Sequence, residues 1–155
     1  MFGARVETSF AGGKASATLW YDYLSGDDPE TAEVELFHTL YAANRKFYGF
    51  ADLFLNSPVH TGGAGLQDLA LKLDWQPEAD VRLAADLHRF RTAQGKVLAS
   101  DDFGTELDLT ISHRYSAHLT ATAGLSRVWT GDALVELGRP SKDMTWFYVM
   151  LDARF

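Results

Sequence analysis

The sequence contains no cysteine and no apolar run of 18 residues or more. A chain without cysteine has neither a disulfide framework nor a thiolate metal site. A membrane-spanning helix needs about 20 consecutive apolar residues, so that type of membrane anchor is excluded. Basic residues are also few, with 14 Lys and Arg against 21 Asp and Glu and a net charge of −7. A nucleic-acid groove needs clustered basic side chains, so this class of function is excluded too.

The first residues, Met1 to Arg5, lack the basic and apolar regions of a signal peptide. We therefore expect the chain to be a mature form, an engineered form or the downstream part of a longer protein.

What the chain does have is apolar and aromatic residues, at 46% and 13% of its 155 positions, together with 13 glycines. The length predicts a single domain over residues 1–155. Aromatic side chains suit pleated surfaces, so the composition favours strands and turns over helices. Strands of a membrane barrel hide their hydrophobicity in alternation, and the mean hydropathy of −0.14 is compatible with such strands.

Alternation with period two is clearest after Gly104. One face carries Thr105, Leu107, Leu109 and Ile111, and the other carries Glu106, Asp108, Thr110 and Ser112. In a helix the three apolar side chains would be spread around the circumference instead of forming one stripe. The pattern therefore predicts a half-buried strand.

The same alternation predicts seven strands in all, near residues 4–10, 16–23, 68–75, 81–88, 105–112, 119–126 and 146–155. With flanking residues, each reaches about ten to twelve residues, which a strand tilted by about 45° needs to cross a bilayer. Bacterial single-chain barrels have an even number of strands. The segment from Lys46 to Phe54 is either an eighth strand or a short element inside a loop, and the sequence leaves both open.

The expected connections differ in length at the two ends of the strands. Short turns are predicted at Gly12-Gly13, at residues 76–80 and at residues 116–118. Longer connections are predicted at about residues 93–102 and 130–143, with a long extracellular loop at about residues 26–64. This asymmetry is typical of outer-membrane barrels. The fold class predicted is therefore an all-β, antiparallel transmembrane barrel with seven or eight strands in this chain.

The last predicted strand ends on Phe155, with Phe147, Val149 and Leu151 on the same face. A terminal Phe resembles the assembly signal that the outer-membrane insertion machinery recognises. We therefore expect that machinery and membrane lipid as partners, with the bacterial outer membrane as the location. The alternative is an ordinary final strand of a soluble β domain.

Several stretches, in this order and spacing, resemble the C-terminal part of the alginate export family of outer-membrane barrels. They are residues 21–28, 39–41, 46–49, 66–69, 86–90, 104–108 and 152–155. The resemblance implies a larger barrel whose earlier strands are absent here, and it places Lys46 to Phe54 in an external loop. It further implies a passive conduit for anionic polysaccharide or other polar solutes. Alginate itself as the cargo would require a basic lumen.

If the apolar faces meet lipid, the other faces line a lumen that carries charges of both signs. Five cationic side chains are the predicted contacts for an anionic solute: Arg5, Lys72, Arg82, Arg114 and Arg154. Asp86, Glu106 and Asp108 are predicted to line the same lumen. Eight carboxylates on these faces outnumber the five cations, so we expect part of the positive charge to be neutralised internally.

No enzyme, metal or cofactor is expected. Glu106 and Asp108 lie two residues apart, a spacing that suits a general acid and base, but no nucleophilic triad accompanies them. The five histidines lack the spacing of a zinc site. The stretch Ser25 to Glu30 lacks the full ligand series of a calcium loop.

Three functions remain open at this point. The first is a porin-like conduit, and the second is a small closed barrel that serves as a structural anchor without a pore. A barrel of about eight strands is filled by its own side chains, so strand number separates these two. The third is a soluble lipocalin-like binder with its apolar face inward. Oligomerisation is left open.

Overall fold

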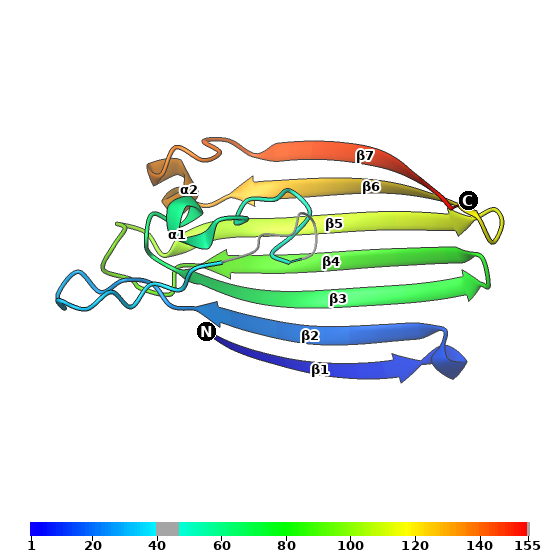
Figure 1. Cartoon of the computed structure of the whole chain (residues 1–155), viewed down its shortest axis with the longest axis horizontal. Helices are drawn as coiled ribbons and strands as arrows, with labels where there is room; N and C mark the ends of the chain where they lie inside the picture. Colours follow the sequence, from blue (N-terminus) through cyan, green and yellow to red (C-terminus); the bar gives the residue numbers. More distant parts are fainter. Residues whose placement is uncertain (40–46, 155) are drawn as a thin grey trace.

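The computed structural model describes residues 1–39 and 47–154. In these residues the fold is all-β, with seven strands in one antiparallel sheet whose spatial order follows the sequence (Figure 1). The strands are β1 (Phe2–Phe10), β2 (Ala15–Leu24), β3 (Leu66–Glu78), β4 (Val81–Arg91), β5 (Asp102–Arg114), β6 (Leu119–Thr130) and β7 (Met144–Ala153). The predicted all-β antiparallel fold is confirmed.

The register between neighbouring strands keeps each predicted face intact across the sheet. Leu71 lies opposite both Leu19 and Leu87, while Lys72 lies opposite Thr18 and Asp86. A shift of one residue would have moved every side chain of a strand to the other face. The alternation seen in single strands therefore becomes one apolar face and one polar face of the whole sheet.

Short and long connections lie at opposite ends of the strands, as the sequence predicted (Figure 1). The short end has the 3₁₀ turn η1 (Ala11–Gly13) and the connections at residues 79–80 and 115–118. The long end has the connections at residues 25–65, 92–101 and 131–143.

One predicted turn was too long, because β3 continues to Glu78 and only residues 79–80 separate it from β4. The register shifts between Trp75 and Glu78. Pro77 lies in this irregularity, where a residue without a backbone N–H is tolerated.

The described part of the segment proposed as an eighth strand, Phe47 to Phe54, forms turns and bends and no strand. Lys46 lies outside the described residues. Phe47 to Phe54 is therefore a folded element inside the long connection between β2 and β3, which is the second of the two alternatives that the sequence left open.

Two short helices lie at the long-connection end, α1 (Ser57–His60) and α2 (Asp132–Glu136). Among the described residues, no helix is long and apolar enough to cross a membrane.

A small apolar core lies at this end of the sheet, on its polar side. Phe54, from the long connection, packs with ring centroids 4.8 Å from Phe90 and 5.3 Å from Phe103. Leu24, Leu66, Val128 and Leu134 complete the buried cluster. The long connection is thereby anchored against β2 to β6 and does not extend freely from the sheet.

The sheet is not closed in the described residues. β1 pairs only with β2, and β7 pairs only with β6. In an antiparallel sheet of seven strands, β1 and β7 run in the same direction, so the antiparallel pattern of the sheet does not allow these two edges to pair with each other.

Candidate functional site on the polar face of the sheet

The two faces of the sheet are buried in the opposite sense to those of a water-soluble domain. On the polar face Asp22, Asp68, His88, Glu106, Asp108 and Ser126 are buried. On the apolar face Leu69, Leu71, Leu73, Trp75, Leu109, Ile111 and Leu125 are 42–49% exposed. Soluble monomers rarely expose contiguous apolar patches larger than a few hundred Å². The polar face is therefore the interior side of this sheet.

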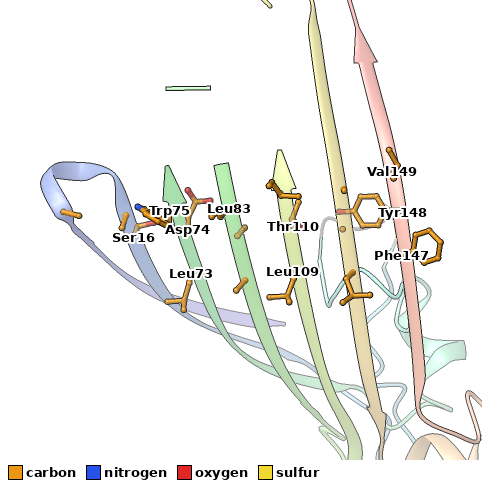
Figure 2. A pocket seen from close by; sticks show the side chains of 18 of the residues that line it. Ser16, Leu73, Asp74, Trp75, Leu83, Leu109, Thr110, Phe147, Tyr148 and Val149 are labelled. Atoms are coloured by element: carbon orange, nitrogen blue, oxygen red, sulfur yellow. The ribbon is translucent and has the colours of Figure 1, made fainter. Parts of the chain in front are cut away.

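The apolar face also has a shallow hollow of about 780 Å³ (Figure 2). Leu73, Leu83, Leu109 and Phe147 line it, and they come from β3, β4, β5 and β7. Few polar groups converge there, so the hollow lacks the means to orient a polar ligand. We treat it as part of the apolar surface.

The long connection is docked onto the polar face through two backbone amides. The amide of Phe50 donates to Asp108 Oδ2 at 3.1 Å, and the amide of Ala51 donates to Glu106 Oε1 at 2.6 Å. Gly49 has a positive φ of 84°, and a Cβ at this position would overlap the Glu106 carboxylate. Close approach of the loop to β5 therefore depends on this glycine.

Two further features follow from this docking. Ser126 donates to the other carboxylate oxygen of Asp108, so β6 shares in holding the loop anchor. Burial raises the pKa of Tyr48, in the same loop, to about 12, with Asp22 and Asp68 contributing in the same direction. Tyr48 is therefore neutral over the physiological range.

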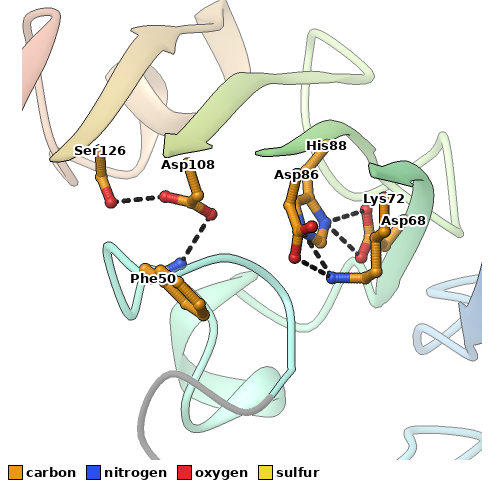
Figure 3. Close-up of polar contacts among 7 residues, drawn as sticks. All are labelled: Phe50, Asp68, Lys72, Asp86, His88, Asp108 and Ser126. Carbon is orange, nitrogen blue, oxygen red and sulfur yellow. Dashed lines mark hydrogen bonds and ion pairs between the residues drawn. The ribbon is translucent and has the colours of Figure 1, made fainter. Parts of the chain in front are cut away.

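Beside the loop, a polar network joins β3 and β4 (Figure 3). Lys72 Nζ lies 2.7 Å from Asp86 Oδ2 and 3.2 Å from His88 Nε2, while His88 Nδ1 lies 2.8 Å from Asp68 Oδ2. His88 and Asp68 are almost completely buried. These contacts hold the Lys72 ammonium group in one position between two partners.

A cleft of about 420 Å³ lies on the polar face beside the loop. Phe50 lines it from the loop, and Lys72 and Asp86 line it from β3 and β4. Arg82 and Asp74 also line the cleft, and they form an ion pair with each other. The cleft thus contains two of the predicted cations, and each of them is paired with a carboxylate.

Two more predicted cations meet at the short-turn end of the sheet. Arg114 and Arg154 line one cleft of about 610 Å³ together with Asp152. Arg114 donates to the carbonyl oxygen of Ala79 at 2.9 Å, and Arg154 Nε lies 3.4 Å from Asp152 Oδ1. Both arginines are exposed. This end therefore carries two exposed cations, close together in one cleft.

Arg5, the fifth predicted cation, lies apart from the others on β1. Its guanidinium carbon is 5.7 Å from the centre of the Trp20 ring on β2, a cation–π contact. Phe155, the predicted assembly signal, lies outside the described residues. The structure therefore brings the predicted site residues into three groups, the loop anchor, the cleft and the short-turn end, with Arg5 separate.

Sequence reasoning did not pair Asp68 with His88, and it did not find the loop contacts. The pair could have been predicted, because both residues lie on the polar faces of their strands, β3 and β4. The loop contacts could not have been predicted, because they use the backbone amides of Phe50 and Ala51, which leave no side-chain signal in the sequence.

The candidate calcium stretch has another partner in the structure. Lys96, from the connection between β4 and β5, lies 3.3 Å from Asp28 and forms a second ion pair with Glu30. The backbone amide of Glu30 and the ammonium group of Lys96 lower the pKa of Asp28. Across residues 1–39 and 47–154, no group of three His, Asp or Glu side chains is arranged to hold a metal ion.

Comparison with known proteins identifies one family. A family model described as alginate export matches residues 2–147, which is most of the chain and includes every strand described above except the end of β7. No curated protein and no solved structure matches the chain.

Proposed function

Because the chain belongs to the alginate export family, we propose that it forms part of the wall of a porin-like channel in the bacterial outer membrane. In this proposal the apolar face contacts lipid, and the polar face lines an aqueous passage for polar solutes. The general role is transport, and the chain's own residues supply the wall and its charges.

The observation that carries this proposal is the inverted burial of the two faces. Carboxylates and a histidine are buried on one face, while leucines and a tryptophan are exposed on the other. In water this arrangement would leave a large apolar surface uncovered. In a bilayer the same apolar surface is covered by lipid, and the polar side chains face a hydrated interior.

Aromatic side chains near both ends of the strands support the same orientation. Trp75 and Tyr115 are exposed near the short connections, and Trp129 is exposed near the long ones. Amphipathic rings of this kind gather at the two membrane–water interfaces. Along the strands, leucines such as Leu71 and Leu109 lie between these two groups of aromatic side chains.

The docked loop supports a passage that is narrowed but lined by polar groups. It covers Glu106 and Asp108, while the cleft beside it keeps Lys72 and Asp86 partly accessible. A polar path beside an inserted loop is the arrangement expected of a selective pore.

One observation favours a second candidate, a closed barrel with a structural role and no pore. The apolar core of Phe54, Phe90 and Phe103 fills the polar side of the sheet at its long-connection end. If the whole interior is filled in this way, the passage is blocked and the protein acts as an anchor. Conductance separates the two candidates.

The experiment combines two measurements on the purified protein, in the intact assembly that it forms in detergent. Folding that depends on detergent or lipid, together with heat-modifiable gel mobility, is expected for a membrane barrel. Stepwise conductance in planar bilayers is expected for a channel wall. A monomer that stays folded and soluble without detergent contradicts the membrane assignment. Folded, inserted protein without conductance favours the structural barrel.

A further inference from the structure

The cleft beside Phe50 is built for an uncharged ligand, although the family name points to a polyanion. We propose that it binds the ring of an uncharged sugar or a similar polyol. The inference deepens the proposed channel function, because it names the class of solute that the passage would favour. It starts from the charges, the hydroxyl groups and the single aromatic ring that line the cleft.

Size and position suit a small polar ring. The volume of about 420 Å³ lies within the range of about 300–1,000 Å³ that is common for small-molecule sites. The cleft lies on the polar face between the loop and β1 to β5. A solute that moves along this face would pass directly over it.

The positive charge in the cleft is already neutralised. Lys72 Nζ lies 2.7 Å from Asp86 Oδ2, and Arg82 is paired with Asp74. A carboxylate on a solute would have to share Lys72 with Asp86, or Arg82 with Asp74, so that two carboxylates would lie close together on one cation. Their mutual repulsion makes that arrangement unfavourable.

The balance of charges in the cleft also disfavours an anionic solute. The cleft is lined by Glu7, Asp74 and Asp86 against Lys72 and Arg82, so three negative charges face two positive ones. A chain of uronic acids would therefore enter against a field of its own sign.

The same groups suit hydroxyls, which both donate and accept hydrogen bonds. Asp86 and Asp74 present acceptors, while Lys72 and Arg82 present donors. Ser16, Thr18 and Thr110 add hydroxyl groups from β2 and β5. A polyol can bond to both members of an ion pair without separating them.

Phe50 supplies an apolar surface at one side of the cleft. Its backbone amide donates to Asp108 of β5 (Figure 3), and its ring makes an edge contact with Tyr148 of β7, with ring centroids 6.2 Å apart. An aromatic face beside a few polar groups is the usual composition of a site that orients a small ligand. The C–H face of a sugar ring would pack against it.

The test measures binding and conductance separately on the same protein. The folded wild-type chain in detergent micelles is titrated by calorimetry with maltohexaose and with a hexamer of galacturonic acid, at about 0.15 M salt, where the Debye length is ~8 Å. We expect maltohexaose to bind at least tenfold more tightly than the uronate. In planar bilayers the same sugar should block the conductance over the same concentration range.

Two substitutions identify the site. Phe50→Leu keeps an apolar side chain on the loop but removes the ring, and it should weaken maltohexaose binding about tenfold. Asp86→Asn frees Lys72 from its ion pair, and it should strengthen uronate binding about tenfold. Val59→Ala, at an exposed position in the same connection, is the matched control and should change neither affinity.

The outcomes separate the two proposals. Sugar binding without conductance keeps this site and overturns the channel function. Conductance with tighter binding of the uronate, or with no binding of maltohexaose, overturns this site and keeps the channel. Equal maltohexaose affinities of the wild type and Phe50→Leu also overturn it.

Discussion

Replacing Leu109 with Arg tests which solvent the apolar face meets. Leu109 lies in the middle of β5, opposite Ala85 and Leu125, and is 42% exposed. On a lipid face near the bilayer midplane, Arg costs about 2–4 kcal/mol. At 1.4 kcal/mol for each factor of ten, this lowers the ratio of folded to unfolded protein by about 30- to 700-fold. A half-exposed position in water would change stability by only about 0.5 kcal/mol.

The assay is reversible urea unfolding of the chain from lipid vesicles, with Leu71→Arg as a second test on β3. Thr110→Arg is the matched control, because Thr110 is the next residue on β5 and lines the polar cleft. We expect the free energy of unfolding to fall by the full amount of about 2–4 kcal/mol in both leucine variants, and by much less in Thr110→Arg. Equal losses on the two faces would show that the assignment of the faces is wrong.

Four other perturbations test separate parts of the account. Deleting Phe155 should slow assembly in cells far more than it lowers the stability of the refolded protein; equal losses would favour simple packing. Changing Arg82 and Arg114 together to Glu should shift the reversal potential partly toward cations without loss of folding, and an unchanged potential would remove both side chains from the ion path. Glu106→Ala should release the loop amide and raise single-channel conductance, whereas Glu106→Gln, which keeps an acceptor, should not. Gly124→Val should destabilise the protein by about 1–3 kcal/mol, because its Cβ would overlap the tyrosine ring opposite on β7; unchanged urea unfolding would contradict that packing.

The strands and their faces were predictable because period two is a local property of the chain. Leu107 and Leu109 share one face of β5 while Glu106 and Asp108 share the other, whichever strands lie beside them. Neighbouring strands repeat the pattern, so the register that keeps the faces together is also the one observed. Position within a strand thus identified which charged side chains lie on the polar face.

The partners of these side chains were not predictable to the same degree. The strand pattern does not say that the loop folds back, because its anchors are two backbone amides whose partners, Glu106 and Asp108, are more than 50 residues away. Nor does it say that Lys72 is shared between Asp86 and His88, which depends on side-chain conformations across two strands. Lys72, Arg82 and Arg154 each lie beside a carboxylate, and the strand pattern alone did not say which carboxylate each would have.

The claim at the centre of this account is that alternate residues of one strand face lipid and water. The chain has no cysteine, so single cysteines at residues 107 to 112 of β5 can carry a spin label without background. In vesicles, collision with oxygen reports contact with lipid, and collision with a water-soluble nickel complex reports contact with water. We predict high oxygen accessibility at 107, 109 and 111, and higher nickel accessibility at 110 and 112 than at their odd-numbered neighbours. The opposite phase, or no alternation along the strand, would contradict the account.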